Sequence, residues 1–319
     1  MKKIGILTSG GDCSGMNAAI RGAVRTALRL NAEIVGFRKG YLGLMNGDCI
    51  NLNSVTVSGT IHRGGTMLQS ARSPEFRTPE GQEKALEKLK ELGVEGLIVA
   101  GGDGSLAGAL ALHRLGFPVV GIPASIDNDI PGTDMALGVD TALNNIVYAI
   151  DCIKDTASSH ARAFVIEVMG RNSGYLASVS AIATGAEFAL VPERQFDLDE
   201  ICRHLRSRYE EGRDNSIIIL AEGAGSGQEI AGRIKDAIGF ETRATVLGHY
   251  QRGGAPTVFD RLLGSRFGKK AVELLAEGKR GIMVGISCSV LSVYPLELVV
   301  NGSKVPDGDL LQLAEVLGI

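Results

Sequence analysis

Short apolar runs rich in β-branched residues recur along the chain, and each ends in glycine, serine, aspartate or proline before a helical pattern begins. Six such runs are predicted as strands: Ile4–Thr8, Glu33–Phe37, Gly96–Ala100, Val119–Pro123, Ala163–Val168 and Ile217–Ala221. Strands that alternate with helices build mostly parallel sheets with helices on both faces. The pattern therefore predicts an α/β fold.

The spacing of hydrophobic residues predicts one helix most clearly, at Pro79–Leu92. Leu86, Leu89 and Leu92 share one face of this helix. Charged residues occupy the other face, and Gly93 ends the helix. We interpret the charged positions as a solvated face.

The length of the chain predicts two lobes, because 319 residues exceed the size at which a single hydrophobic core usually stops growing. No linker rich in proline, glycine or serine divides the sequence, so the lobes must interleave. A content of 45% hydrophobic and 22% charged residues is typical of a globular protein. The apolar runs are too short for a membrane span or a secretory signal, so we expect a soluble protein without a membrane partner.

The cysteines and the net charge indicate the cellular compartment and bear on nucleic-acid binding. The five cysteines are scattered and show neither a Cys-x-x-Cys pair nor zinc spacing, which favours a reducing cytoplasm. The formal net charge is -3, basic residues form no stripe, and aromatic residues are few. We therefore expect no nucleic-acid partner.

A first glycine-rich segment, residues 8–17, follows the first predicted strand and leads into a helix that begins near Asn17. Such a turn presents backbone N–H groups and a helix dipole to anions, and Gly10, Gly11 and Gly15 let phosphate oxygens approach the backbone. A tight turn that merely needs positive φ explains the same glycines equally well.

A second glycine loop, residues 101–105, follows the strand at 96–100. Asp103 stands among its glycines, which suits a Mg²⁺ ion that bridges nucleotide phosphates. The Gly-Gly-Asp-Gly pattern also occurs in lipid and NAD kinases, so it indicates a phosphoryl donor better than an acceptor. Residues 264–270 do not match a Walker A motif, because only three residues separate the glycines and no Ser or Thr follows the lysine.

Two short echoes also occur in the sequence. Residues 61–66 resemble residues 250–255, and residues 10–12 resemble residues 101–103. They are too short to establish an internal duplication.

An acidic turn, residues 125–129, follows the strand at 119–123 and is expected at the same sheet edge as both glycine loops. Of Asp127 and Asp129, one could accept the proton of a hydroxyl group while the other helps to organise a metal ion. The alternative is an Asx-turn capped by aspartate and asparagine, which is the commoner use of such clusters.

Taken together, five segments resemble the bacterial 6-phosphofructokinase family in order and in spacing over nearly the whole chain. The segments are residues 8–17, 101–105, 125–134, 167–171 and 247–254. The resemblance implies two interleaved, Rossmann-like, three-layer α/β lobes with mostly parallel sheets. The larger, ATP-binding lobe would comprise residues 1–138 and 251–301. The smaller, sugar-phosphate-binding lobe would comprise 139–250 and 302–319.

The resemblance implies transfer of the γ-phosphate of MgATP to the 1-hydroxyl of fructose 6-phosphate. Asp127 would take the proton of that hydroxyl, supported by Ser125, Asp129 and Arg171, and Arg72 would stabilise the transferring charge. The residues implied to contact ATP are Gly11, Arg72, Ser73, Gly102, Asp103, Gly104 and Ser105, with Asp103 on the side of the magnesium ion.

For the acceptor, the resemblance implies two groups of residues. Met169, Gly170, Arg171 and Glu222 would line the sugar. His249 and Arg252 would hold its 6-phosphate, and Arg162 and Arg243 resemble a pair that reaches this phosphate across a subunit boundary. The alternatives are a surface ion pair for the two arginines and a buried, hydrogen-bonded side chain for His249.

Two other activities are weighed against ATP-dependent transfer. Relatives that use pyrophosphate commonly carry Asp where this chain has Gly104 and Lys where it has Ala124, so ATP is favoured. Ala124 nevertheless departs from the usual glycine of the ATP enzymes, and Ser125 replaces a threonine. A catalytically silent nucleotide-binding regulator would leave Asp127 and Arg252 without a purpose.

The resemblance also implies a homotetramer and a second, intersubunit site for ADP or phosphoenolpyruvate. The residues that fit this effector site are Arg21, Arg25, Lys154, Gly185, Glu187 and Arg213. Glu211 stands where a basic residue is expected, and Gly59 replaces an acidic one. Repulsion between Glu211 and an effector phosphate is expected to weaken effector binding. The sequence from Ser289 onward shows no readable chemistry.

Overall fold

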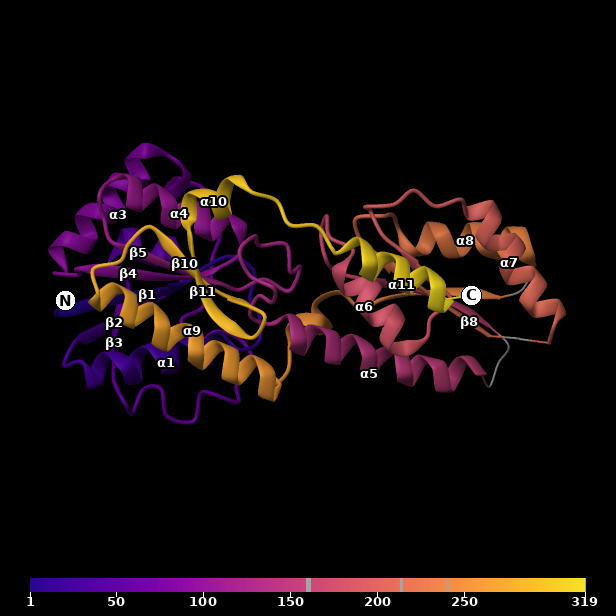
Figure 1. Cartoon of the computed structure of the whole chain (residues 1–319), viewed down its shortest axis with the longest axis horizontal. Coiled ribbons are helices and arrows are strands. Elements are labelled where there is room, and N and C mark those ends of the chain that lie inside the picture. The colour runs from indigo at the N-terminus through magenta and orange to yellow at the C-terminus, as the bar shows by residue number, and fades with distance from the viewer. Residues whose placement is uncertain (159–161, 213–214, 240, 319) are drawn as a thin grey trace. The chain divides into compact units, whose positions relative to one another are not determined.

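The computed structural model describes residues 1–158, 162–212, 215–239 and 241–318, which form two compact units (Figure 1). The larger unit comprises residues 1–126, 130–141 and 252–304. The smaller unit comprises the described parts of 127–129, 142–251 and 305–319. After the acidic turn, the chain passes from one unit to the other at 141/142, 251/252 and 304/305.

The larger unit contains a seven-stranded sheet with the order β11-β10-β5-β4-β1-β2-β3. Its strands are β1 (Lys3–Thr8), β2 (Glu33–Phe37), β3 (Cys49–Leu52), β4 (Gly96–Gly101), β5 (Val119–Pro123), β10 (Ile282–Ser287) and β11 (Val290–Pro295). β1, β2, β4, β5 and β10 are parallel, whereas β3 and β11 pair antiparallel at the two edges. The central strands are buried on both faces, as expected for a parallel sheet covered by helices.

Helices cover both faces of this sheet (Figure 1). The helices are α1 (Met16–Arg29), α2 (Gly40–Asn46), α3 (Pro79–Glu91), α4 (Asp103–Arg114), α9 (Val258–Ala276) and α10 (Leu296–Asn301). α1 packs closely on α9, because a Cβ at Gly264 or Gly268 would collide with the backbone of α1. The run 264–270 is therefore part of a helix and forms no phosphate-binding loop.

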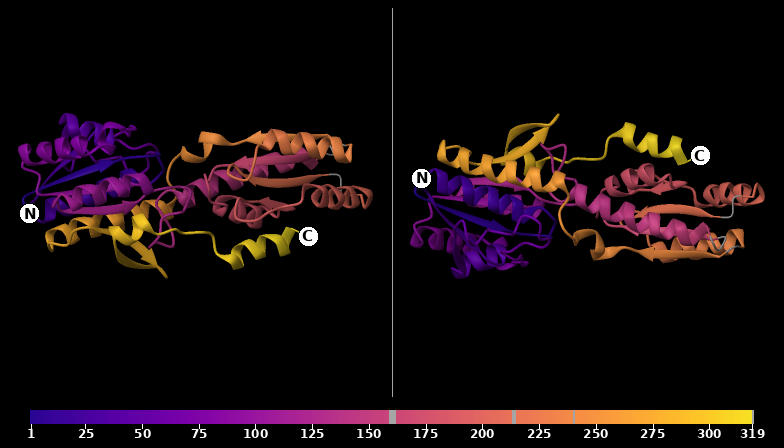
Figure 2. Two further views of the ribbon diagram at one scale, coloured as in Figure 1. Left: turned by 90° about the horizontal axis from the view of Figure 1, so that it is seen from above. Right: turned by 90° about the horizontal axis from the view of Figure 1, so that it is seen from below.

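The smaller unit contains a parallel four-stranded sheet with the order β7-β8-β6-β9. Its strands are β6 (Ala163–Val168), β7 (Phe188–Leu190), β8 (Ser216–Ala221) and β9 (Thr242–Val246). The helices are α5 (Val139–Ser158), of which 139–141 belong to the larger unit, α6 (Tyr175–Thr184), α7 (Leu198–Glu210), α8 (Gly227–Ile238) and α11 (Gly308–Gly318). In Figure 2 the yellow C-terminal chain runs from the β10–β11 hairpin of the larger unit to α11 of the smaller one.

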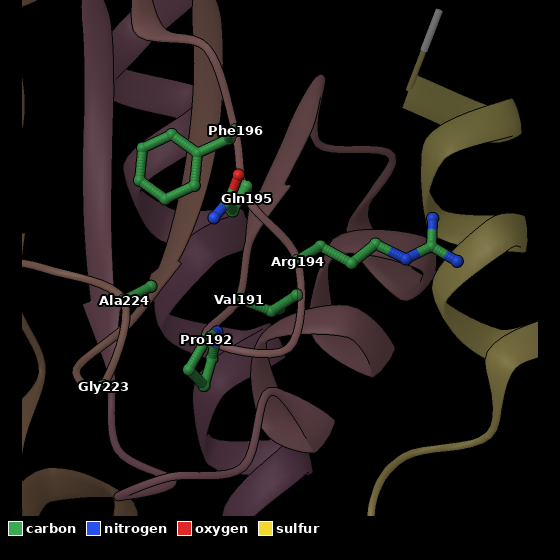
Figure 3. A pocket seen from close by; sticks show the side chains of 7 residues that line it. All are labelled: Val191, Pro192, Arg194, Gln195, Phe196, Gly223 and Ala224. Carbon is green, nitrogen blue, oxygen red and sulfur yellow. The ribbon is translucent and has the colours of Figure 1, made fainter.

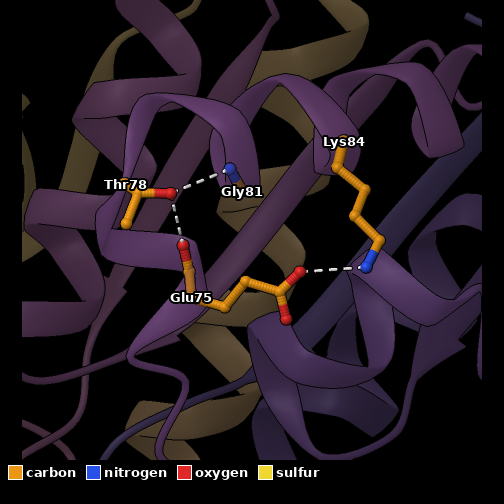
Figure 4. Close-up of polar contacts among 4 residues, drawn as sticks. All are labelled: Glu75, Thr78, Gly81 and Lys84. Carbon is orange, nitrogen blue, oxygen red and sulfur yellow. Dashed lines mark hydrogen bonds and ion pairs between the residues drawn. The ribbon is translucent and has the colours of Figure 1, made fainter.

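The predicted α/β class with mostly parallel sheets is confirmed, and all six predicted strands are present to within one residue at each end. The predicted helix at 79–92 spans Pro79–Glu91, with Leu92 as its C-cap, and Gly93 follows with a φ of 66°. Thr78 caps its first turn by accepting a hydrogen bond of 3.2 Å from Gly81 N (Figure 4). Within the described residues, no helix is long and apolar enough to span a membrane.

Candidate active site

The two glycine loops lie side by side because β1 and β4 are parallel neighbours and end at the same edge of the sheet. Ser9 N donates to Ala100 O over 2.9 Å. A Cβ at Gly10 would lie 3.1 Å from Ser105 Oγ, which places Ser105 of the second loop against the first. Gly10 and Gly15 have φ values of 84° and 99°, and α1 begins immediately after Gly15. The glycines thus meet the need for positive φ at the N-terminus of a helix.

The second glycine loop opens directly into α4. Asp103 is the first residue of this helix, and the preceding Gly102 has an extended backbone and offers no side-chain cap. Asp103 and Gly104 are exposed, whereas Ser105 is buried. A Cβ at Gly104 would meet no atom within 4 Å. The start of α4 therefore offers exposed backbone N–H groups and free space to an anion.

Tyr41, which the sequence analysis did not select, fixes the position of this loop. Its hydroxyl donates to Ser105 O over 2.6 Å, and its ring stacks on Phe76 with centroids 3.9 Å apart. A Cβ at Gly108 would lie 2.8 Å from the ring, so α4 packs directly on Tyr41. Complete burial raises the pKa of Tyr41 well above its usual value, so the phenol stays a donor.

The segment that carries Arg72 and Ser73 is anchored just after these residues. Arg72 is exposed, and Ser73 Oγ is buried without a hydrogen-bond partner among the described residues. The 3₁₀ helix η1 (Glu75–Arg77) follows, with Phe76 buried against Tyr41 and Glu75 paired with Lys84 at 3.0 Å (Figure 4). The unpaired Ser73 hydroxyl marks a position at which a bound polar group would gain a partner.

Asp12 organises the loops behind the first glycine turn. Its Oδ1 accepts a hydrogen bond from Thr66 N over 2.9 Å, and its backbone oxygen accepts one from Arg252 Nη1 over 3.0 Å. Burial raises the pKa of Asp12, while the Thr66 bond and the charge of Arg252 act in the opposite direction. The echo segments 61–66 and 250–255 meet here, since a Cβ at Gly64 would collide with Gly254.

The acidic turn begins beside the second glycine loop, because a Cβ at Gly102 would lie 3.7 Å from Ser125 Cβ. Asp127 is 4% exposed and Asp129 is half-buried. Asn128 between them has a φ of 51°, a left-handed conformation that asparagine tolerates better than most residues. The turn thus buries the Asp127 carboxylate, which is unusual for an acid that serves only as a solvated cap.

The residues that follow the acidic turn are held by the C-terminal hairpin, to which the sequence analysis assigned no chemistry. Ile286 N donates to Thr133 Oγ1 over 3.1 Å, and Cys288 N donates to Asp134 Oδ2 over 2.7 Å. Lys304 Nζ donates to the backbone oxygens of Thr133 and Asp134 over 2.7 and 3.0 Å. The hairpin and Lys304 therefore fix Thr133 and Asp134, which follow the acidic turn in the chain.

In the smaller unit, the turn 169–171 after β6 is held by side chains from two other segments. Glu222 Oε1 accepts hydrogen bonds from Arg171 N and Gly170 N over 2.8 and 3.3 Å. Gln251 Oε1 accepts one from Met169 N over 3.0 Å. Glu222 and the buried Gln251 thus fix the backbone of the predicted sugar pocket, a role for Gln251 that sequence analysis missed.

Arg171 brings a cation to Asp127. Its backbone has a φ of 54°, and its Nε lies 4.0 Å from Asp127 Oδ2. The side chain of Arg171 is 57% exposed, whereas that of Asp127 is 6% exposed. The pair combines a buried carboxylate with a guanidinium that can still reach a ligand.

Of the predicted phosphate-binding residues of the smaller unit, Arg243 and His249 are exposed and Arg162 is half-buried. Arg162 Nε lies 3.0 Å from Glu241 Oε2, and Arg243 donates to Glu241 Oε1 over 2.9 and 2.8 Å. The hydrogen bond with Arg243, followed by the charge of Arg162, lowers the pKa of Glu241. His249 is exposed in the 3₁₀ helix η2 (Gly248–Arg252), so the buried alternative considered for it does not hold.

The predicted effector residues are distributed over both units. Arg21 and Arg25 lie on α1 of the larger unit, and Arg25 Nη2 donates to Ser54 O over 3.4 Å. In the smaller unit, Lys154 donates to Thr184 O, and Glu187 Oε2 accepts a bond of 2.6 Å from Ile217 N. Gly185 has a φ of 61° as the C-cap of α6. Arg213 lies outside the described residues.

A depression of about 380 Å³ in the smaller unit contains none of the predicted site residues (Figure 3). It is lined by Val191, Pro192, Arg194, Gln195, Phe196, Gly223 and Ala224. The side chain of Arg194 points toward α11, where it pairs with Glu315. Its guanidinium is therefore engaged with the C-terminal helix.

Comparison with known proteins gives a consistent result. A family profile described as phosphofructokinase matches residues 3–275. The chain is 53% identical to the ATP-dependent 6-phosphofructokinase of Bacillus pumilus and 52% identical to that of Halalkalibacterium halodurans, over 100% of all three chains. The structure of phosphofructokinase from Saccharomyces cerevisiae superposes with a TM-score of 0.88 at 37% identity. That match covers 94% of this chain and 45% of the yeast chain, so this chain spans less than half of the yeast protein.

Proposed function

The chain belongs to the phosphofructokinase family, and we propose that it acts as an ATP-dependent 6-phosphofructokinase. It transfers the γ-phosphate of ATP to the 1-hydroxyl of fructose 6-phosphate and releases fructose 1,6-bisphosphate and ADP, a step of glycolysis. The observation that carries this proposal is an identity above 50% over the full length to bacterial relatives of that name.

The nucleotide binds at the paired glycine loops. Backbone N–H groups of the two loops bind the phosphates, and the glycines let the phosphate oxygens come close to the backbone; the residues are Gly11, Gly102, Gly104 and Ser105. The open space at Gly104 and the uncapped start of α4 favour this arrangement. Arg72 lies exposed for the transferring phosphoryl group, and the unpaired Ser73 hydroxyl gains a partner from the nucleotide. The larger unit is therefore the ATP-binding lobe.

Asp103 faces the metal. No group of three or more metal-binding side chains occurs in the described part of the chain, so the exposed Asp103 does not belong to an all-protein metal cage. This arrangement fits Mg²⁺, which is usually held by one or two carboxylates together with substrate phosphates and water. Bound Mg²⁺ neutralises charge on the phosphates during transfer.

Asp127 is the base. Its buried carboxylate accepts the proton of the 1-hydroxyl, Ser125 and Asp129 orient the turn, and Arg171 balances the negative charge that gathers around the transferring group. Phosphoryl transfer needs positioning and charge compensation more than covalent chemistry from the protein. The cation of Arg171 at the surface of a buried carboxylate supports this division of roles.

The smaller unit supplies most of the sugar-phosphate site. Met169, Gly170 and Arg171 line the sugar, and Glu222 acts through the turn that its carboxylate holds. His249 and Arg252 bind the 6-phosphate. The enzyme works in the cytoplasm as a homotetramer. Arg162 and Arg243 of a neighbouring subunit add positive charge to this site. They release Glu241 and bind the 6-phosphate in its place.

Pyrophosphate is the less favoured donor. The bacterial relatives that are 53% and 52% identical over the full length carry the ATP-dependent name, and Gly104 leaves room that the charged residue of a pyrophosphate enzyme would occupy. Ala124 is buried at the end of β5 and introduces no charge. A silent regulator is also less favoured, because it gives the Arg171–Asp127 pair no role.

ADP or phosphoenolpyruvate would bind at Arg21, Arg25, Lys154, Gly185, Glu187 and Arg213. Two features favour weak binding of these effectors. Glu211 brings a negative charge to the effector phosphate, and Glu187 is already engaged by Ile217 N and by Arg208 at 3.8 Å.

A coupled assay tests the proposal. Turnover of fructose 6-phosphate is measured with ATP and Mg²⁺, and separately with pyrophosphate and Mg²⁺, each with and without ADP or phosphoenolpyruvate. We expect turnover with ATP and little with pyrophosphate. A preference for pyrophosphate, or no turnover with either donor, would contradict the proposed function.

A further inference from the structure

Helices α5 and α9 cap each other at their N-termini. Both begin close to a point where the chain crosses from one unit to the other. α5 starts at Val139, just before the passage at 141/142, and α9 starts at Val258, shortly after the passage at 251/252. Asp260 on α9 is completely buried. Its Oδ1 accepts a hydrogen bond of 2.8 Å from Gly138 N, and its Oδ2 accepts bonds of 2.8 and 2.5 Å from the N and Oγ1 of Thr141. Asp260 thus caps the first turn of α5.

The connection also runs in the opposite direction. Thr257 caps α9, because its Oγ1 accepts a hydrogen bond of 3.3 Å from Asp260 N. The same hydroxyl donates to Asp140 Oδ2 over 2.5 Å, and Thr257 N donates to Thr141 Oγ1 over 3.1 Å. Each threonine hydroxyl therefore donates once and accepts once. We call the set Asp140, Thr141, Thr257 and Asp260 the cap ring.

The cap ring differs from an ordinary helix cap by its burial. Asp197, which caps α7, is exposed and accepts one hydrogen bond, from Asp199 N. Asp260 is buried, which raises its pKa, and the nearby charge of Asp140 acts in the same direction. Burying a carboxylate is costly unless hydrogen bonds compensate, and here both oxygens are used to join two helices. The arrangement is more elaborate than capping of one helix requires.

The cap ring holds one end of the segment that carries Arg252. Between Arg252 and α9, Ser14 Oγ donates to Gly254 O over 3.1 Å, and Arg261 Nε donates to Pro256 O over 2.7 Å. The segment then reaches Thr257, where the ring fixes it to α5. A change in the ring therefore acts on a short segment whose other end is the proposed ligand of the 6-phosphate.

We propose that Asp260 and Thr257 are positioning residues that set the affinity of the enzyme for the sugar phosphate by fixing the segment of Arg252. This inference rests on the proposed function, in which Arg252 binds the 6-phosphate. Contacts with a ground-state phosphate mainly set the Michaelis constant, so loosening of the segment raises KM for fructose 6-phosphate more than it lowers kcat.

The chain offers a matched pair for the test. Thr257 and Thr78 are both N-caps whose hydroxyl accepts a hydrogen bond from the backbone N–H three residues later. Thr78 caps α3, and Thr78→Ala therefore removes an equivalent cap that is not part of the ring (Figure 4). We expect Thr257→Ala to raise KM for fructose 6-phosphate by about 2- to 30-fold, the range of factors equivalent to one lost cap. Thr257→Ser, which restores the hydroxyl, should return KM to within about twofold of wild type on the same basis.

Several readouts keep the inference falsifiable. Thermal unfolding is measured for both alanine variants, and Thr78→Ala should lose comparable stability while KM for fructose 6-phosphate stays unchanged. Asp260→Asn is a second variant, expected to raise KM for the sugar phosphate and to leave KM for ATP nearly unchanged. Equal KM for fructose 6-phosphate in wild type, Thr257→Ala and Asp260→Asn would overturn the inference while the proposed function stands. No turnover by the wild-type enzyme would overturn both.

Discussion

The proposed nucleotide loops of the larger unit and the proposed phosphate-binding arginines of the smaller unit are held in contrasting ways. Tyr41 fixes one glycine loop through a buried hydrogen bond, and Asp12 fixes the other through a part-buried one. Arg162 and Arg243 are held by Glu241, an exposed carboxylate at the surface. The proposed nucleotide loops are therefore preorganised, whereas the two proposed phosphate-binding arginines would have to exchange one anionic partner for another. Substitutions in the glycine loops and substitutions around the arginines should therefore differ in the size of their effect and in the kinetic constant that they change.

The largest effect is expected at the proposed general base. Asp127→Ser should lower kcat by roughly 10²–10⁴-fold, the usual contribution of a positioned general base. The binding constant for fructose 6-phosphate should change far less, because the base acts in the transition state. Steady-state kinetics combined with titration calorimetry would separate the two effects. Parallel losses of binding and turnover would count against Asp127 as the base.

A charge placed on the nucleotide side should have the next largest effect. Gly104 is exposed, has space for a side chain, and stands at the second position of α4, where aspartate suits the helix dipole. Gly104→Asp should therefore fold normally, yet raise KM for ATP about tenfold through repulsion of the phosphates. Gly104→Ala is the matched control and should behave like wild type. A normal KM for ATP in Gly104→Asp would place the nucleotide elsewhere.

Preorganisation of the nucleotide loop is tested at Tyr41. Tyr41→Phe keeps the stack on Phe76 and removes only the hydrogen bond to Ser105 O. We expect a loss of about 1 kcal/mol in the free energy of unfolding. KM for ATP should rise by about two- to fivefold on the same basis, and KM for fructose 6-phosphate should stay constant. A rise in KM for the sugar phosphate alone would contradict the idea that Tyr41 preorganises the nucleotide loop.

A smaller and opposite effect is expected at Glu241. Glu241→Gln releases Arg162 and Arg243 from their ion pairs, so the guanidinium groups bind the 6-phosphate without first losing a partner. KM for fructose 6-phosphate should fall by about twofold, and the midpoint of thermal unfolding should move by less than about 2 °C, because exposed ion pairs contribute little. A rise in KM would indicate that Glu241 holds the arginines in the productive position.

The two regions should also differ in the sign of their pH dependence. The pKa of Asp12 is raised in the folded state, so its contribution to stability declines as pH rises from the ordinary value of 3.8 through the raised one. The pKa of Glu241 is lowered, so its contribution is present above the ordinary value of 4.5 and is lost as pH falls through the lowered one. Urea unfolding of wild type, Asp12→Asn and Glu241→Gln between pH 3 and 7, a range chosen to span these values, would measure both slopes. Slopes of the same sign would contradict the assignment.

Sequence reasoning predicted most of the buried strands, because these strands are continuous apolar runs, although the buried strand β10 was not among them. It missed β9 and β11, where the chain is partly exposed and the strand carries polar residues or forms an edge. It also missed β3 and β7. A strand whose stability comes from its neighbours, rather than from its own composition, leaves a weak pattern in the sequence.

For the candidate site, parallel topology was enough to predict that the glycine loops and the acidic turn leave the same sheet edge. Gly10 with Ser105 and Gly102 with Ser125 show this proximity. The contact of Tyr41 with Ser105 spans 64 positions and that of Asp260 with Thr141 spans 119, so neither leaves a local spacing signal. Such partners are set by tertiary packing alone.

The most direct test of the account is a crystal structure of the enzyme with Mg²⁺, a non-hydrolysable ATP analogue and fructose 6-phosphate. If Asp127 is the base, the 1-hydroxyl oxygen will lie within about 2.6–3.2 Å of its carboxylate, the range of a catalytic hydrogen bond. We also expect the terminal phosphoryl group at Gly104 and the metal beside Asp103. A 1-hydroxyl directed away from Asp127, or a nucleotide bound away from residues 102–105, would contradict the account.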